Sequence, residues 1–238
     1  MVVDTDDLST LAVANIDASG GAAYTFYANG TADPGLTTEM LPILGETVRA
    51  LHMGTCSLVF EPSGSTLEAL FLRERATGTR FLALDPNVRI GLVSDVDAYR
   101  GRIERMIAAA DLVKVSDADI EALWPGEDII ERVAVLAGSG PGVTVLTRGG
   151  DALLAFRGNG DTASVPAERV EVVDTIGAGD TANAAMLAWL SNHGALSRAA
   201  LAELTDDQVA EMLRFAARAA AITCSRAGAD PPWASELI

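Results

Sequence analysis

The tetrapeptide Gly177-Ala178-Gly179-Asp180 combines an anion-binding turn with a carboxylate. Glycine has no Cβ, so an anion can come close to the backbone amides of Gly177 and Gly179. The Ala-rich segment 181–192 has helical spacing, and the first amides of a helix carry the positive end of its dipole without an internal partner. Amides that hold phosphate charge, beside a carboxylate that takes a proton, are what phosphoryl transfer to a hydroxyl requires.

The tetrapeptide alone is better explained as a helix N-terminus with a capping Asp and a flexible turn. The longer pattern from Asp174 to Asp180, Asp-Thr-x-Gly-Ala-Gly-Asp, is far more specific. It resembles the C-terminal signature of the ribokinase-like (PfkB) carbohydrate kinases. The resemblance implies that Asp180 is the catalytic base. It also implies that the amides of Gly177, Ala178 and Gly179 stabilise the transferred phosphate.

Two further stretches resemble the sugar-contacting parts of fructokinases in this family. Asp85-Pro86-Asn87 favours a turn on residue types alone. At the end of a predicted strand and followed by Arg89, it resembles their Asp-Pro-Asn-x-Arg motif, which implies that Asn87 and Arg89 contact the sugar or its phosphate. Arg89 is the better phosphate partner, because a guanidinium matches phosphate geometry. Tyr24 lies in a Tyr-x-Phe-Tyr run that looks like a strand of their sugar-covering lid, although ordinary strand packing explains it equally well.

The resemblance also implies ATP contacts. Lys114 stands where many members carry the Asn of an Asn-x-x-Glu motif tied to Mg²⁺ and phosphate, and fructokinase-like members often carry Lys there. Asn183, one turn into the signature helix, either reaches the nucleotide or is a plain surface residue. The remaining ATP-binding candidates are Thr147 and Gly149, in a Thr-x-Gly pattern, and Gly228.

The resemblance also implies residues that bind cations. Asp117 matches the Glu of the Asn-x-x-Glu motif, but a capped helix with an acidic first turn explains it equally well. Mg²⁺ held mainly by ATP phosphates and water needs little protein coordination. Asp174 and Ile176 are the residues implied to supply oxygens to a monovalent cation such as K⁺.

Composition excludes several classes of protein. The 238 residues are 49% hydrophobic, enough for one α/β domain with a large core. A net charge of −16 argues against nucleic acid or an anionic membrane as a partner. No apolar run is long enough to span a bilayer and no signal peptide is evident, so we expect a cytoplasmic protein. Cys56 and Cys224 lack metal-ligand spacing and are expected to be buried free thiols in a reducing compartment.

The periodicity predicts a β-hairpin followed by alternating strands and helices. Runs 10–14 and 22–27 flank a turn-rich stretch and predict the hairpin. The later alternation predicts a mostly parallel sheet covered by helices, with antiparallel edge strands. We therefore expect a partial β lid over 9–32 and an α/β nucleotide-binding kinase core over 33–238. The expected core strands are 49–54, 81–84, 112–115, 143–147, 152–156, 163–166 and Val172-Val173, and the expected helices are 65–77, 96–110, 128–137, 181–192 and one that begins at a capping box formed by Thr205 and Gln208.

In open α/β sheets, ligands bind beyond the carboxyl ends of the strands, where these polar groups would meet. The resemblance, closest to fructokinases, implies ATP-dependent phosphorylation of a sugar primary hydroxyl, with fructose as the first candidate. It leaves open 2-keto-3-deoxygluconate, ribose or a nucleoside as acceptor, an inactive nucleotide-binding module, and a homodimer formed through the lid. Members begin with a strand that ends in a sugar-binding Asp and with a Gly-Gly-x-x-x-Asn stretch. Nothing before Ser9 matches these, so we expect an N-terminal truncation with weak ATP binding and little activity.

Overall fold

The computed structural model describes residues 5–16, 22–54 and 56–237, with the side chains of 14–16 and 22–24 left aside. Its main sheet has the strand order β3-β4-β5-β6-β7-β8, in which β3 to β6 are parallel and β7 and β8 are antiparallel. A second, two-stranded antiparallel sheet is formed by β1 and β2. The strands are β1 Leu11–Ile16, β2 Ala22–Tyr27, β3 Ala50–Gly54, β4 Phe81–Asp85, β5 Leu112–Ser116, β6 Val143–Thr147, β7 Ala152–Arg157 and β8 Thr162–Pro166.

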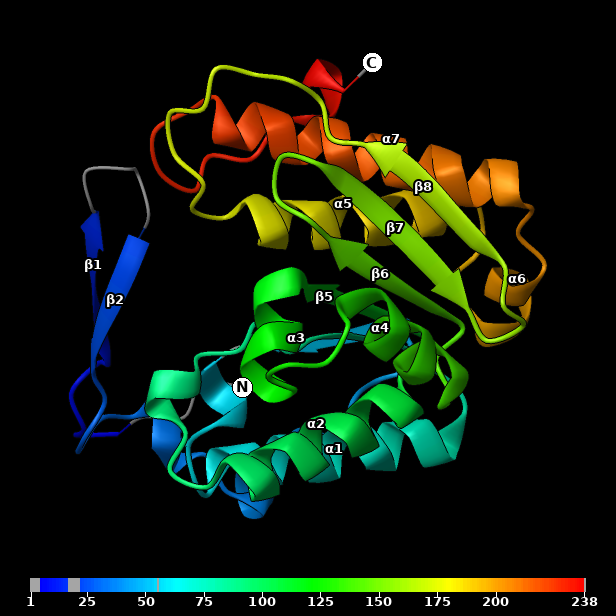
Figure 1. Ribbon diagram of the computed structural model, residues 1–238. Coiled ribbons are helices and arrows are strands. Elements are labelled where there is room, and N and C mark those ends of the chain that lie inside the picture. Colours follow the sequence, from blue (N-terminus) through cyan, green and yellow to red (C-terminus); the bar gives the residue numbers. More distant parts are fainter. Residues whose placement is uncertain (1–4, 17–21, 55, 238) are drawn as a thin grey trace.

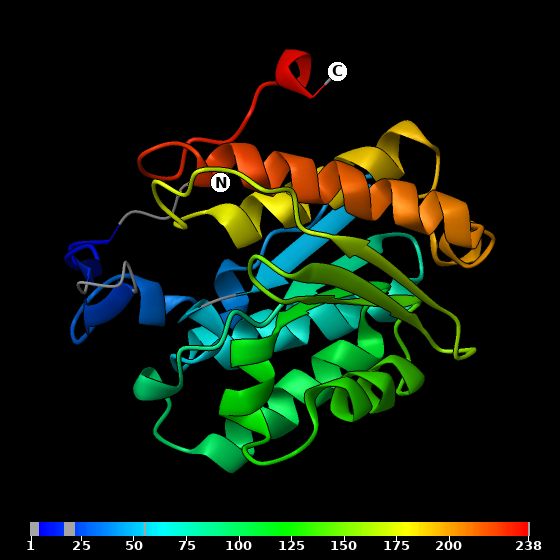
Figure 2. The same cartoon turned by 45° about the horizontal axis from the view of Figure 1, so that its top comes forward.

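Helices cover both faces of the main sheet, so the body has three layers (Figures 1 and 2). On one face lie α1 to α4, and on the other lie α5 to α7. The helices are α1 Ser63–Thr77, α2 Val96–Ala109, α3 Asp117–Leu123, α4 Ile129–Gly138, α5 Ala178–Asn192, α6 Arg198–Ala202 and α7 Asp206–Cys224. Short 3-10 turns occur at Asp33–Gly35, Thr38–Met40, Cys56–Leu58, Ile90–Leu92 and Ala234–Glu236. None of the described helices is long and apolar enough to cross a membrane.

The central strands are buried on both faces, which explains their nearly continuous apolar sequences. Along β4, Leu82 and Leu84 pack into the core under α1 and α2, whereas Phe81 and Ala83 pack into the core under α5 and α7. Lys114 in β5 interrupts this apolar pattern and is itself buried. The neighbouring strand β4 ends in a second buried charged residue, Asp85.

The hairpin sheet β1–β2 projects from one side of the body (Figure 1). At the base of the hairpin, the segments before β1 and after β2 are linked by a bridge between Leu8 and Thr31. The hydroxyls of Thr10 and Thr31 also form a 2.7 Å hydrogen bond there. The predicted hairpin and the mostly parallel sheet are confirmed. The predicted capping box between Thr205 and Gln208 at the start of α7 is also confirmed.

Two expectations are wrong. Val172 and Val173 form no strand: they are 62% and 60% exposed and lie in the loop between β8 and α5. The sheet already ends at β8, so this segment instead attaches to the end of α7, where the amide of Val173 donates to the carbonyl of Cys224 at 2.8 Å. Cys56 and Cys224 are free thiols as expected, but both are only partly buried because they lie at the ends of elements.

Candidate active site

The signature residues lie at the carboxyl edge of the sheet. Strands β3 to β6 are parallel, so their ends at Gly54, Asp85, Ser116 and Thr147 share one edge. Strand β8 runs in the same direction as β6, because two antiparallel pairings separate them, and it also ends there. The loop 167–177 starts at this edge and leads into α5. The signature therefore reaches the ligand-facing edge without the strand that the sequence predicts.

The turn opens α5 one turn earlier than expected. Gly177 is the N-cap residue with φ +80°, and Ala178, Gly179 and Asp180 form the first turn of the helix. The side chain of Asp180 is exposed and makes no hydrogen bond or ion pair within the described part of the chain. Helix amides and an available carboxylate are thus side by side, which is the arrangement that phosphoryl transfer needs.

The signature loop, residues 174–177, is hydrogen-bonded to the segment that follows α7. The carboxylate of Asp174 accepts hydrogen bonds from the amides of Ile176 at 3.0 Å and Gly228 at 2.9 Å. These two bonds lower the pKa of Asp174, because they stabilise the charged form. A Cβ added to Gly177 would lie 2.9 Å from the Cβ of Ala229, so the two loops are in direct contact.

A buried polar cluster lies under the start of α5. The ammonium of Lys114 and the side-chain amide of Asn183 both donate to Oδ2 of Asp85, at 3.0 and 2.7 Å. Asn183 is only 4% exposed, so it is not a surface residue. Burial raises the pKa of Asp85 and outweighs the attraction of Lys114. Asp85 was not among the candidate site residues, although its position at a strand end is visible in the sequence.

His52 in the edge strand β3 also faces this region. The protein packed around its ring lowers its pKa, and the nearby carboxylates of Asp85 and Asp180 oppose that shift. His52 as a whole is nevertheless an exposed residue. Sequence analysis assigns His52 no role, since an isolated histidine without a partner pattern carries little signal.

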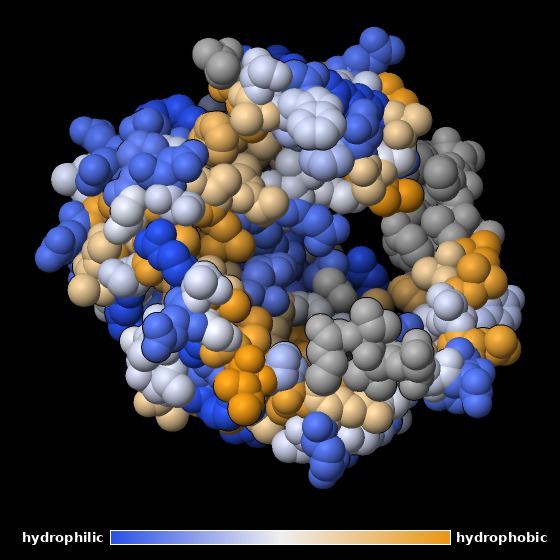
Figure 3. Space-filling view, turned by 180° about the vertical axis from the view of Figure 1, so that it is seen from behind, coloured by the Kyte–Doolittle hydropathy of each residue, from blue (hydrophilic) through white to orange (hydrophobic). Residues whose placement is uncertain are grey.

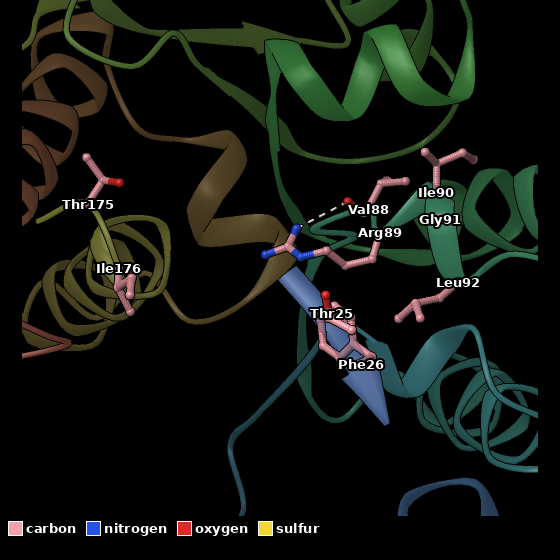
Figure 4. A pocket seen from close by; sticks show the side chains of 9 residues that line it. All are labelled: Thr25, Phe26, Val88, Arg89, Ile90, Gly91, Leu92, Thr175 and Ile176. Carbon is pink, nitrogen blue, oxygen red and sulfur yellow. Dashed lines mark hydrogen bonds between the residues drawn. The ribbon is translucent and has the colours of Figure 1, made fainter. Parts of the chain in front are cut away.

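A cavity of about 710 Å³ separates the hairpin sheet from the signature loop. Figure 4 shows the guanidinium of Arg89 extending into it, with Thr25 and Phe26 on one side and Thr175 and Ile176 across the opening. The surface seen from behind is also hollowed between the hairpin sheet and the body (Figure 3). The cavity therefore joins two of the predicted site residues, Arg89 and Ile176.

Arg89 is held by the loop that follows β4. Its Nη1 donates to Oδ1 of Asn87 at 2.6 Å, so the predicted sugar-contacting residue Asn87 also orients Arg89. Asn87 has φ +39°, a conformation that Asn tolerates better than most residues. The loop is anchored by the buried Asp119, whose Oδ1 accepts from the amide of Val88 at 2.6 Å. Asp119 was missed, although Ser116-x-x-Asp119 has capping-box spacing and does form such a box.

The remaining candidates occupy the same edge. Thr147 ends β6, and Gly149, with φ +51°, lies in the turn to β7. Asp117 accepts a hydrogen bond from the amide of Ala118 in its own helix. No group of three or more His, Cys, Asp or Glu side chains in the described residues fits a metal ion, and the role of Asp117 in Mg²⁺ binding stays a prediction. Tyr24 lies on β2, but the structure does not describe its side chain.

The pfkB family carbohydrate kinase model matches residues 1–236. The chain belongs to the pfkB family of carbohydrate kinases. This pfkB-family chain is 39% identical over 198 residues to a fructokinase of Rhizobium leguminosarum bv. trifolii, which covers 83% of this chain and 60% of that protein. It is 30% identical over 241 residues to fructokinase-1 of Oryza sativa subsp. japonica, which covers 100% of this chain and 72% of that protein.

Solved structures show the same fold. A fructokinase from Xylella fastidiosa matches 98% of this chain with a TM-score of 0.83 and 22% identity, over 72% of its own length. A fructokinase double mutant from Vibrio cholerae O395, bound to fructose, ADP and potassium, matches 95% of this chain with a TM-score of 0.79 and 22% identity, over 70% of its own length. The pfkB-family chain spans about 60% of the length of the first curated relatives that it matches.

Proposed function

We propose that this chain transfers the γ-phosphoryl group of ATP to a primary hydroxyl of a sugar, with fructose as the first acceptor. The observation that carries the proposal is the exposed, unpaired carboxylate of Asp180 in the first turn of α5, directly beside the amides of the glycine turn. Family membership supports the reaction class. The names of the relatives, which are 30% to 39% identical, support the choice of sugar.

In the proposed mechanism, Asp180 takes the proton of the sugar hydroxyl as its oxygen attacks the γ-phosphorus in line. The bond from that phosphorus to the bridging oxygen breaks, and ADP leaves with the electron pair. The amides of Gly177, Ala178 and Gly179 hold the charge on the phosphoryl oxygens, since they have no partner within the helix. Mg²⁺ carried by the nucleotide would supply further charge neutralisation.

The acceptor would lie in the 710 Å³ cavity, between residues 9–32 acting as a lid and the kinase core formed by residues 33–238. Arg89 and Asn87 would contact it from the core, and Tyr24 from the lid. ATP would lie over Thr147, Gly149 and Gly228 at the same sheet edge. The carboxylate of Asp174 and the backbone oxygen of Ile176 would hold a monovalent cation, in line with the potassium ion bound to the fructokinase double mutant of Vibrio cholerae O395.

A different acceptor is the second candidate. An aminoimidazole riboside kinase from Salmonella enterica, bound to its riboside, matches 90% of this chain with a TM-score of 0.74.

Leu11, Val13 and Tyr27 on the hairpin sheet are 56%, 39% and 60% exposed. Contiguous exposed apolar side chains favour a covering partner, which supports a homodimer formed through the lid.

Thermal unfolding with ligands tests the proposal. Each ligand that binds the folded chain should raise its unfolding temperature, and a concentration of 100 Kd contributes about 2.7 kcal/mol, roughly 5–10 °C for a chain of this size. We expect ATP with Mg²⁺ and fructose both to stabilise the chain weakly, and ADP to form slowly when both are present, in keeping with the weak binding and low activity expected from the sequence. Stabilisation by ATP alone would instead indicate a nucleotide-binding module. Stabilisation by ribose or a nucleoside and not by fructose would change the acceptor.

Replacing Arg89 with methionine should raise the KM for the sugar by about 10- to 100-fold, because a charge-assisted hydrogen bond contributes on the order of 1.5–3 kcal/mol. The affinity for ADP should stay the same, since Arg89 lines the acceptor cavity. Arg214→Met removes an exposed arginine from α7 and is the matched control. An unchanged sugar KM in steady-state kinetics of Arg89→Met would exclude Arg89 from the acceptor site.

A further inference from the structure

Three buried side chains from distant parts of the sequence meet beneath the signature turn. Asp85 ends β4, Lys114 lies in β5 and Asn183 lies in α5, and their exposed fractions are 2%, 5% and 4%. Lys114 and Asn183 converge on one oxygen, Oδ2 of Asp85. Burying two charges costs free energy that a single ion pair rarely recovers, so such a pair is weak evidence of a stabilising role.

The hydrogen bonding of this cluster is incomplete. Oδ1 of Asp85 is buried and has no hydrogen-bond partner among the described residues. An ammonium group has three donors, and Lys114 makes one hydrogen bond within the described chain. Native proteins rarely leave buried polar groups unpaired, so each case needs a reason beyond packing.

The same chain contains, for comparison, a buried carboxylate in which both oxygens accept hydrogen bonds. Asp111, at the start of β5 and 1% exposed, accepts from Arg75 at 3.0 Å and from Arg198 at 2.7 Å on Oδ1. Its Oδ2 accepts from the amide of Leu82 at 2.8 Å. Both oxygens of this structural carboxylate are used, and it lies at the opposite edge of the sheet from the signature.

The ammonium of Lys114 lies against the turn. A Cβ added to Gly179 would be 3.0 Å from Nζ of Lys114, so the ammonium touches the space that this glycine leaves open. Asn183 follows Gly179 by one helical turn in α5. The cluster therefore connects the sheet to the helix start at the point where phosphate would approach the amides.

We infer that Asp85 and Asn183 are positioning residues that hold the ammonium of Lys114 under Gly179, where it contacts the terminal phosphate of ATP. This inference rests on the proposed kinase function and adds the two residues that act through Lys114. Asp85 keeps the ammonium in place from the sheet. Asn183, which lies in α5, prevents the carboxylate of Asp85 from rotating.

The test compares nucleotides that differ by the terminal phosphate. Binding of ADP and of the non-hydrolysable β,γ-methylene analogue of ATP, both with Mg²⁺, is measured by calorimetry on the intact chain. Lys114→Met should weaken binding of the analogue by about 10- to 100-fold and leave ADP binding within about threefold. Asp85→Asn and Asn183→Ala should each cause a smaller loss that is also confined to the analogue.

Combining Asp85→Asn with Lys114→Met should cause no further loss, because Asp85 acts through Lys114. Asp111→Asn is the matched control: it should lower the unfolding temperature without changing the ratio of the two affinities. Lys114→Gln, with a smaller change in the core, replaces Lys114→Met if that variant does not fold. Equal losses for both nucleotides, or additive losses in the double variant, would overturn the inference. The kinase proposal would stand in that case, provided that the wild-type chain binds both nucleotides. Binding of neither nucleotide by the wild-type chain would overturn both.

Discussion

Replacing Asp180 with asparagine is expected to lower kcat for sugar phosphorylation by about 10²- to 10⁴-fold, the usual contribution of a positioned general base. The amide is nearly the same size as the carboxylate but does not accept a proton. Because the side chain of Asp180 is exposed, its replacement breaks no hydrogen bond or ion pair in the described part of the chain. Stability and ADP affinity should therefore stay close to those of the wild type.

The measurement is a coupled assay for ADP formation, with ADP affinity and unfolding temperature recorded for each variant. Asp207→Asn is the matched control, because Asp207 is also an exposed carboxylate in the first turn of a long helix. It should turn over like the wild type. If Asp180→Asn retained wild-type kcat, Asp180 would not be the base, and the proposed mechanism would lose its central residue.

Elements governed by local patterns could be predicted from the sequence. The central strands are nearly continuous apolar runs because helices bury both of their faces, and such runs are visible without a structure. The start of α7 is equally local, since Thr205 and Gln208 cap it reciprocally within four residues. The glycine turn at the start of α5 is equally local, because Gly177 to Asp180 are contiguous in the sequence.

Features that depend on tertiary pairing could not be predicted. The β-branched Val172 and Val173 have strand propensity. They do not pair with β8, the last strand of the sheet, and they remain exposed in a loop. Asn183 had two equal interpretations, because its partner Asp85 is 98 residues away in the sequence. Lys114 is 29 residues from the same carboxylate, so the buried cluster exists only once the sheet and α5 are assembled.

Replacing Gly177 with alanine should be the most damaging change in the turn that leaves every charge in place. Gly177 has φ +80°, a backbone conformation that costs an L-residue on the order of 1–2 kcal/mol. The added Cβ would also lie 2.9 Å from the Cβ of Ala229, so one of the two loops must move. Misplacement of a reacting group by about 1 Å can cost roughly 100-fold in rate, and we expect a loss of kcat of that order.

The comparison with Gly126→Ala separates the two causes. Gly126 has a similar φ of +85°, but a Cβ there meets nothing within 4 Å. That variant should lose stability through the backbone term alone and keep its kcat. In the double variant Gly177→Ala with Ala229→Gly, the 2.9 Å contact is removed, whereas the 3.2 Å approach to the Cα of residue 229 and the cost of the positive φ remain, so kcat should recover in part. Equal kcat for Gly177→Ala and Gly126→Ala, or no recovery in the double variant, would show that contact between the signature turn and the loop after α7 does not set the position of the phosphate-binding amides.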